Sequence, residues 1–219
     1  MTSSEAPEKK SYGQYCGLAR AAELVGERWA LLILRDLFVG PRRFSDLHRG
    51  LPKIPTNILT TRLKELEAAG IVRRVVRERP LVGVAYELTE RGRDLEPAVV
   101  ALARWGAQAL GDPRPGEIVT EDSLVMALRT TFRPETAGDV EASYQLELGD
   151  ITLHARVKGG VLEVGGGAID QPDLVIEPGT VLRALLAGEI DPATARREGL
   201  VELRGRVRLF QRFIEMFRI

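Results

Sequence analysis

The sequence predicts an α+β protein in two parts, a mainly helical part followed by a part in which a sheet packs against helices. Three observations support this prediction. The first half repeats apolar side chains at helical spacing, and the segments 142–149 and 151–157 alternate apolar and polar side chains like half-buried strands. The proline- and glycine-rich stretch GDPRPG separates the halves. A length of 219 residues accommodates two ordinary domains.

The first half predicts a series of helices and a ribbon of two strands. Apolar side chains recur three and four residues apart, and glycine or proline ends each run. The expected helices, with a break in the first at Gly26, are 16–38, 44–51, 55–69 and 94–110. The expected strands, 71–78 and 84–89, are joined by the hairpin loop 79–83.

The second half predicts a sheet with interspersed helices. The expected strands are 142–149, 151–157, 161–164, 173–177 and 200–204. The expected helices are 121–132, 179–187, 192–198 and 206–219. The run Gly165-Gly166-Gly167 lacks the spacing of a dinucleotide-binding turn, so it is interpreted as a strand end or a bulge.

The helix 55–69 has an unusual outward face. On a helical wheel its large apolar side chains share one arc, and the opposite arc of the first two turns has Thr and Asn where soluble helices usually place Glu and Lys. A short helix precedes it and a basic ribbon follows. Helix, turn, helix and ribbon together predict a winged helix-turn-helix, in which the second helix enters the major groove of DNA.

Short polar side chains on such a helix suit base contacts, because Asn pairs with adenine and Thr contacts a polar base edge or the thymine methyl. Helix capping is the competing explanation, but capping occupies one such residue rather than four. Arg62 falls inside the apolar arc, so its stem is expected to pack and its head to pair with an acid. The candidate DNA-contacting residues are Arg42, Arg43, Ser45, Thr56, Asn57, Thr60, Thr61, Lys64, Arg77 and Arg79.

The charge distribution agrees with a polyanionic partner for the first half. Residues 1–110 contain 18 basic and 13 acidic side chains, and residues 111–219 contain 13 and 18, although the whole chain is neutral. Between Arg35 and Arg79 the excess is 11 basic against 5 acidic side chains. This imbalance favours double-stranded DNA as a partner, although random scatter of charge can also produce it.

The segment 16–74 together with 86-YELTERGRDL-95 resembles the HxlR family of bacterial transcription regulators, relatives of the MarR-type winged-helix repressors. The resemblance implies a homodimer joined through the first and last helices of the domain, with apolar stripes that include Leu18, Val99, Leu102 and Trp105. The same stripes could instead pack within one chain. It also places Cys16 where some relatives carry an oxidant-sensing cysteine, whose pKa Arg20 could lower; a simple packing role is the alternative.

The end of the chain, 173–217, resembles a sterol carrier protein type-two-like domain. That resemblance implies an apolar cavity for a hydrophobic small molecule, and it makes the second half a ligand-binding-like α+β domain. The candidate lining residues are Leu128, Phe132, Phe210, Phe213 and Phe217. A plain core helix shows the same apolar stripe, so core packing stands as the alternative for each of them.

Catalytic and metal-binding patterns find little support in the sequence. His48 and His154 are the two histidines and Cys16 the single cysteine, without the close spacing of a metal site. We therefore expect no enzyme, no metal and no cofactor. The N-terminus lacks an apolar secretory segment and no run is long enough to span a membrane, so a cytoplasmic location without membrane contact is expected.

The resulting prediction is a dimeric DNA-binding regulator that recognises a pseudo-palindromic operator and responds to a hydrophobic molecule in its second domain. A redox regulator acting through Cys16, with a structural second domain, is one alternative. A small-molecule or lipid carrier that uses the winged helix as a dimerisation scaffold is another. The expected organisation is a disordered tail 1–12, a DNA-binding and dimerisation domain 13–110, a linker 111–118 and a sterol-carrier-like domain 119–219.

Overall fold

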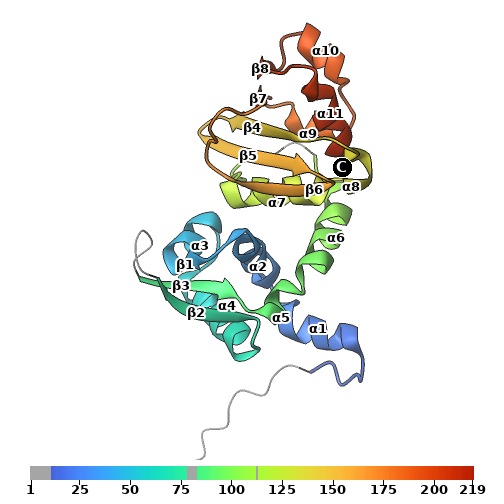
Figure 1. Cartoon of the computed structure of the whole chain (residues 1–219). Helices are drawn as coiled ribbons and strands as arrows, with labels where there is room; N and C mark the ends of the chain where they lie inside the picture. The colour runs from blue at the N-terminus through green and yellow to red at the C-terminus, as the bar shows by residue number, and fades with distance from the viewer. Residues whose placement is uncertain (1–10, 78–82, 112) are drawn as a thin grey trace, which may run out of the picture. The chain divides into compact units, whose positions relative to one another are not determined.

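The computed structural model describes residues 11–77, 83–111 and 113–219 (Figure 1). The chain forms two compact units, Met1–Glu96 and Pro97–Ile219. Each unit has its own sheet and its own buried side chains, so each is treated separately below. The mixture of helices and strands is the α+β composition that the sequence predicts.

The N-terminal unit contains a helix-turn-helix followed by a strand ribbon (Figure 1). Its helices are α1 (Gly17–Val25), α2 (Ala30–Val39), α3 (Phe44–Gly50), α4 (Thr56–Ala68) and α5 (Glu90–Arg93). Its strands are β1 (Arg42–Arg43), β2 (Val72–Arg77) and β3 (Gly83–Leu88), paired antiparallel in the order β1-β3-β2. This is the predicted winged helix-turn-helix, with β1 as a strand that the sequence did not indicate.

The break between α1 and α2 lies at Gly26, as predicted, and it has a steric cause. A Cβ atom on Gly26 would lie 2.5 Å from the carbonyl oxygen of Ala22, which is too close for any larger residue. Helix α2 then starts after Trp29, whose φ of 82° is a left-handed conformation that large aromatic residues rarely adopt. The turn between these helices is therefore a constrained bend.

The core of the N-terminal unit determines which face of α4 remains outside. Its buried side chains come from α2, α3, α4 and the ribbon, and they include Ile33, Leu34, Leu47, Leu59, Leu63, Leu66, Val72 and Leu88. The three leucines of α4 recur at spacings of four and three, so one stripe of the helix is buried. Burial of a leucine contributes roughly 1.5–3 kcal/mol, and three of them hold the opposite stripe toward solvent.

The sequence predicts one helix over 94–110, but the structure forms α5 and then α6 (Glu96–Ala107). The Thr89 hydroxyl accepts a hydrogen bond from the Gly92 amide at 3.1 Å and donates one to the Gly70 carbonyl at 2.7 Å. Gly92 lies against the Ile71 carbonyl, where a Cβ atom has no room. These contacts define α5 as a separate turn, which local periodicity does not reveal.

The C-terminal unit is built on a mixed sheet with strand order β6-β5-β4-β7-β8 (Figure 1). The strands are β4 (Ala142–Leu148), β5 (Ile151–Lys158), β6 (Val161–Gly166), β7 (Leu174–Glu177) and β8 (Glu202–Gly205). Besides α6, the helices are α7 (Glu121–Thr131), α8 (Pro134–Ala137), α9 (Leu182–Leu186), α10 (Pro192–Arg197) and α11 (Leu209–Met216). All five predicted strands are present, whereas α8 was not predicted.

One face of this sheet is buried and the other is polar. In β5, Leu153 and Ala155 are fully buried, whereas His154 between them lies on the polar face, as predicted. Helix α7 contacts the buried face at β5 and β6, and the Glu121 carboxylate occupies the space that a side chain at Gly166 would need. The glycine run therefore ends β6, as interpreted from the sequence, and makes room for the start of α7.

The boundary between the compact units lies between Glu96 and Pro97, whereas the sequence places a linker at 111–118. Arg104 of α6 shows why this helix belongs to the C-terminal unit. Its Nε donates to the Thr130 carbonyl at 3.0 Å, and its Nη2 lies 3.4 Å from the Phe132 carbonyl. Carbonyls at a helix C-terminus lack helical partners and favour a cation, so Arg104 attaches α6 to the end of α7.

Candidate nucleic-acid interface

The outward face of α4 presents the side chains that the sequence assigns to DNA. They are Thr56, Asn57, Thr61 and Lys64, which are exposed, and Thr60, which is half-buried. The opposite face of the helix is buried through Leu59, Leu63 and Leu66, each at most 1% exposed. Because the apolar stripe anchors the helix, the polar stripe has one orientation, as a reading surface requires.

The hydroxyl groups of two threonines on this face are already engaged as donors. Thr60 Oγ1 donates to the Thr56 carbonyl, and Thr61 Oγ1 donates to the Asn57 carbonyl, both at 2.9 Å. Each hydroxyl therefore presents free lone pairs and an adjacent methyl group rather than a proton. This arrangement accepts hydrogen bonds from base amino groups and offers apolar contact to a thymine methyl.

Helix capping does not account for these residues. The residue before α4 is Pro55, and no side chain forms a cap hydrogen bond at this end. Thr56 Oγ1 instead lies 3.5 Å from His48 Nε2 of α3, and the His48 ring stacks on Phe44 with centroids 6.4 Å apart. The start of α4 is thus positioned by α3, and its polar side chains are left for another role.

Arg62 occupies the position that the sequence predicts for it. Its side chain is only 16% exposed, and its guanidinium pairs with Glu65 and, at 3.1 Å, with Glu27 in the turn between α1 and α2. The prediction of a packed stem and an acidic partner is confirmed. This ion pair joins α4 to the turn between α1 and α2, so Arg62 positions α4.

Arg42 and Arg43 form the short strand β1 immediately before α3. They pair with Tyr86 and Ala85 of β3, and Arg42 Nη1 donates to the Pro41 carbonyl at 3.0 Å. Both arginines are half-buried, and the Nε atom of Arg43 is buried without a hydrogen-bond partner in the described residues. Ser45, the second residue of α3, is exposed. These three residues thus lie next to one another at the start of the helix-turn-helix.

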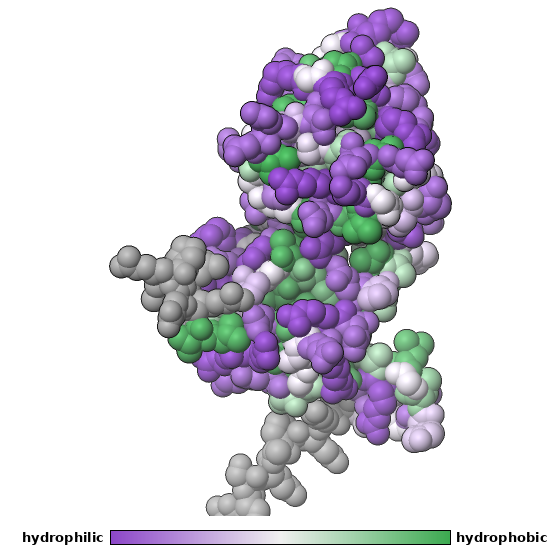
Figure 2. Space-filling model, viewed as in Figure 1, coloured by the Kyte–Doolittle hydropathy of each residue, from purple (hydrophilic) through white to green (hydrophobic). Residues whose placement is uncertain are grey.

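The ribbon provides a second candidate surface. Arg74 is exposed and lies over the Tyr86 ring at 5.8 Å, a contact that sequence reasoning did not identify. Val76 and Val84, which face each other across β2 and β3, are 83% and 43% exposed, and Figure 2 shows hydrophobic surface where the ribbon ends. Arg77 ends β2, but its side chain lies outside the described residues, as does the whole of Arg79.

Cys16 lies at the N-terminal end of α1 and is exposed. The nearby backbone amides of Ala19 and Leu18 lower the pKa of its thiol. The expectation that Arg20 could lower this pKa is wrong, because Arg20 is paired with Glu23 at 2.8 Å. The free backbone amides of the first helical turn, and not Arg20, lower the pKa of Cys16.

The side chains predicted to line a ligand cavity meet one another in the interior of the C-terminal unit. They are Leu128, Phe132, Phe210, Phe213 and Phe217, and none is more than 7% exposed. The ring centroids of Phe213 and Phe217 are 4.4 Å apart, and those of Phe132 and Phe217 are 5.4 Å apart. Such distances mean direct ring contact, so this aromatic cluster packs as the alternative of a core predicts.

Tyr144 completes the aromatic cluster and brings a polar atom into it. Its ring centroid lies 5.1 Å from that of Phe213, and its hydroxyl is buried without a hydrogen-bond partner among the described residues. Burial raises the pKa of this hydroxyl to about 12. A buried hydroxyl without a partner costs roughly 1–3 kcal/mol, so the C-terminal unit contains an unsatisfied donor in its core.

The described ranges contain no group of three His, Cys, Asp or Glu side chains that could hold a metal ion. His48 contacts α3 and α4 as above, and His154 Nδ1 lies 3.0 Å from the Gly167 carbonyl. Across the same ranges, none of the helices combines the length and apolar character needed to cross a bilayer.

Comparison with known proteins places the similarity in the N-terminal half. The family model for the HxlR-like helix-turn-helix matches residues 24–113, which include α2 to α6. An uncharacterised HTH-type transcriptional regulator of Mycobacterium tuberculosis is 49% identical over 98 residues, which are 45% of this chain and 60% of that protein. A second such regulator, from Synechocystis, is 36% identical over 110 residues, which are 50% of this chain and 82% of that protein.

Among solved structures, the reduced form of the transcriptional regulator YodB from Bacillus subtilis is 36% identical. The aligned segment covers 48% of this chain and 100% of the YodB chain, with a TM-score of 0.39. The chain spans 60% of the length of the mycobacterial relative. The segment 24–113 that matches the family contains α3, α4 and the ribbon. The similarity therefore includes the elements that form the candidate interface.

Proposed function

This chain belongs to the HxlR-like helix-turn-helix family of transcription regulators, and we propose that it reads a specific double-stranded DNA operator through α4. The observation that carries the proposal is the outward face of α4. Its exposed Asn57 and Lys64 have no side-chain partner in the described residues, and its threonines present lone pairs and methyl groups. A face with unused hydrogen-bonding groups on a rigid helix suits the major groove.

Each side chain of the interface has a proposed role. Asn57 pairs with the N6 and N7 atoms of an adenine, and Thr60 and Thr61 accept from base amino groups or contact a thymine methyl. Lys64, one turn later, binds a phosphate or a guanine. Arg42, Arg43 and Ser45 bind phosphates at the start of α3. Arg77, at the end of β2, and Arg79 extend the contacts along the duplex. We propose no catalytic role for this chain.

We further propose that the functional form is a homodimer. Exposed apolar side chains on α1 and α6 support it: Leu18 is 78% exposed, Leu102 48% and Trp105 72%. Figure 2 shows hydrophobic residues at the surface of α1, the helix at the lower right of Figure 1. Surface of this kind on a soluble chain commonly marks an interaction site. Two copies would place two α4 helices about 34 Å apart on a pseudo-palindromic operator.

For the C-terminal unit we propose an effector role. Its support is the aromatic cluster and the unpaired hydroxyl of Tyr144, because a hydrophobic molecule with one acceptor atom would satisfy both. Such a molecule has to replace ring contacts, since the five predicted lining residues are buried against one another. Coupling between this unit and DNA affinity, typically about 1–3 kcal/mol, makes the regulator ligand-responsive.

A second candidate function is redox regulation through Cys16. The exposure of Cys16 and its lowered pKa favour it, because the thiolate is the form that reacts with oxidants. A Cys16→Ser variant separates the two candidates. In this variant, DNA binding should no longer respond to oxidant but should still respond to a hydrophobic molecule. That result would assign oxidant sensing to Cys16 and sensing of the hydrophobic molecule to another site.

The proposed function is tested by fluorescence anisotropy with a labelled fragment of the promoter beside the gene of this protein. A scrambled fragment serves as competitor, and salt is titrated upward. We expect retention of the promoter fragment at about 150 mM salt and a steep loss of affinity with rising salt, because several phosphates are neutralised. Equal affinity for the two fragments at every salt concentration would reject sequence reading by α4.

Single substitutions then test whether the side chains of α4 determine the affinity for the promoter fragment. Asn57→Ala removes a bidentate contact of about 1–3 kcal/mol, so affinity for the promoter fragment falls by roughly five- to 150-fold. Alanine is a better helix former than asparagine, so the fold is retained. Thr180→Ala, at an exposed position of the C-terminal unit, is the matched control and leaves affinity unchanged.

A further inference from the structure

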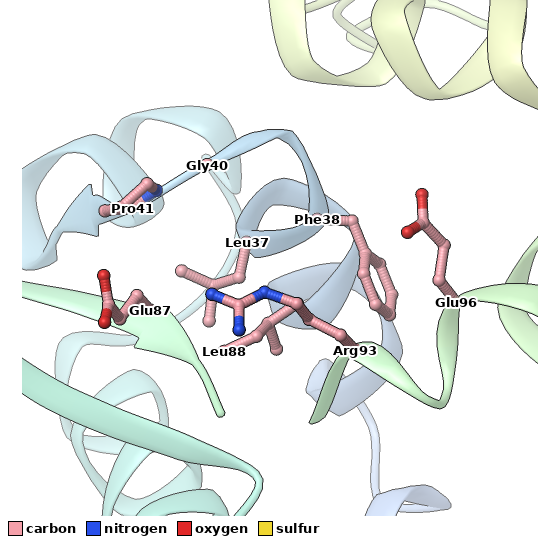
Figure 3. Close-up of a pocket in the computed structure, with 8 residues that line it drawn as sticks. All are labelled: Leu37, Phe38, Gly40, Pro41, Glu87, Leu88, Arg93 and Glu96. Carbon is pink, nitrogen blue, oxygen red and sulfur yellow. The ribbon is translucent and has the colours of Figure 1, made fainter. Parts of the chain in front are cut away.

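A small pocket opens in the N-terminal unit, and none of its lining residues belongs to α4 (Figure 3). Its volume is about 120 Å³. The residues that line it come from the end of α2, the following turn, the end of β3, α5 and the first residue of α6: Leu37, Phe38, Gly40, Pro41, Glu87, Leu88, Arg93 and Glu96. All of them belong to the compact unit Met1–Glu96.

The inner wall of the pocket is apolar and well supported. Leu37 and Leu88 are 3% exposed and Phe38 is 8% exposed, so these side chains are held by the core behind them. A closed apolar cavity of about 150 Å³ in another protein binds benzene. A pocket of 120 Å³ with an open mouth therefore has room for one ring or a short branched chain with its polar end outside.

The charged groups at the mouth differ in how they are already paired. Arg73 of β2 binds Glu87, with Arg73 Nε 2.8 Å from Glu87 Oε1, so this carboxylate is neutralised from within the ribbon. Figure 3 shows the Arg93 guanidinium reaching between the carboxylates of Glu87 and Glu96. Within the described residues the Arg93 side chain has no ion pair or hydrogen bond. A free guanidinium beside an apolar wall matches a carboxylate.

The backbone around the pocket is the backbone that carries two proposed phosphate contacts. Pro41 directly precedes Arg42, whose Nη1 donates to the Pro41 carbonyl at 3.0 Å. Strand β1 is held by β3, where Arg42 faces Tyr86, the neighbour of Glu87. A molecule lodged between Pro41 and Glu87 therefore contacts β3 and the residue directly before β1, and it can shift Arg42 and Arg43.

We propose that this pocket binds a small monocarboxylate with a compact apolar body, and that its occupancy changes the affinity of the winged helix for DNA. The apolar body lies against Leu37, Phe38 and Leu88, and the carboxylate pairs with Arg93. The regulatory step rests on the proposed DNA-binding function, whereas binding to the pocket does not. The site is separate from the aromatic cluster of the C-terminal unit.

Isothermal titration calorimetry of the full chain with benzoate tests the binding step, and benzamide is the uncharged probe of the same shape. We expect benzoate to bind at least tenfold more tightly than benzamide, because the amide cannot form an ion pair. Arg93→Gln abolishes this preference and Arg93→Lys retains part of it. Arg91→Gln is the matched control, since Arg91 is on the same helix but donates to the Ala69 carbonyl and is absent from the pocket.

Equal affinity for the two probes, or a benzoate affinity that Arg93→Gln leaves unchanged, would overturn the pocket as a carboxylate site. The anisotropy measurement is then repeated with saturating benzoate. A change in promoter affinity of fivefold or more in the wild type, absent in Arg93→Gln, supports the regulatory step. Arg93-dependent benzoate binding without any effect on promoter affinity overturns that step, while benzoate binding without any promoter binding rejects the DNA-reading function itself.

Discussion

Helices α4 and α11 each bury one face, but they differ in whether the polar side chains on the exposed face have partners. On α11, Gln211 donates to Glu215 at 3.2 Å, and Arg212 pairs with Glu215 and donates to the Thr136 carbonyl. On α4, Asn57 and Lys64 have no such partners in the described residues. The polar groups of α11 are therefore engaged within the helix and, through Arg212, with the Thr136 carbonyl, whereas Asn57 and Lys64 of α4 are left available for a partner molecule.

The largest effect that tests this comparison is expected in the core below α11. Phe213→Ala removes a fully buried ring that contacts Phe217 and Tyr144, so the C-terminal unit should lose about 3–5 kcal/mol of unfolding free energy. Each unit has one tryptophan, Trp29 in the first and Trp105 in the second. Variants with a single tryptophan therefore report the denaturant unfolding of each unit separately.

Gln211→Ala on the outer face of α11 is the control and should change this free energy by less than about 0.5 kcal/mol. A loss below about 1 kcal/mol for Phe213→Ala would contradict a packed aromatic cluster. It would instead indicate that the cluster has room for a ligand.

The second effect concerns the outer face of α4. Replacement of Thr60 and Thr61 together by Val keeps the shape and the methyl groups but removes two acceptor oxygens. If these oxygens accept from base amino groups, promoter affinity falls by roughly five- to 150-fold, at about 0.5–1.5 kcal/mol for each of the two lost hydrogen bonds. Anisotropy measures the change, and Thr60→Ser with Thr61→Ser, which restores the oxygens, should recover part of it. Full affinity of the valine variant would show that these threonines contribute shape alone.

A smaller effect is expected at Tyr144. Tyr144→Phe removes a buried hydroxyl without a partner, so the C-terminal unit should gain about 1 kcal/mol. The pH dependence gives an independent check. The pKa of Tyr144 is raised to about 12 from the model-compound value of 10.0, so the folded state retains the proton. The resulting contribution to stability is complete below pH 10 and is lost as pH rises through about 12.

Titration of unfolding free energy from pH 9 upward should therefore show a decline in the wild type that is reduced in Tyr144→Phe. Parallel pH profiles for the two proteins would mean that the hydroxyl has the same proton affinity folded and unfolded. A loss of stability in Tyr144→Phe at neutral pH would mean that the hydroxyl has a partner.

The smallest effect is expected at Cys16, in the N-terminal unit. Backbone amides lower the pKa of its thiol, so more thiolate is present at pH 7.5 than in an unfolded chain. Alkylation by iodoacetamide, followed by mass spectrometry, should be faster in the folded protein than in urea. The rate should rise with pH and level off at a lower pH than in urea. Equal rates in the two states would remove the basis for redox sensing.

Most helices and strands could be predicted from local patterns, and so could the buried face of α4. The spacing of Leu59, Leu63 and Leu66 predicts which face of α4 is buried, and the position of Arg62 inside that arc predicts its acidic partner. The separate turn α5 could not be predicted, because it depends on the contact between Gly92 and the Ile71 carbonyl, 21 residues apart in the sequence.

The sequence by itself determined the winged helix-turn-helix and the family, because helical periodicity, turn residues and the α4 polar face are local properties of the chain. Only the tertiary structure decided that α6 joins the C-terminal unit, since Arg104 finds its carbonyl partners 26 and 28 residues away. It also decided that the aromatic cluster packs ring on ring and that residues from Leu37 to Glu96 enclose a pocket. Whether apolar side chains fill a space or surround one depends on distances between segments, which no local pattern encodes.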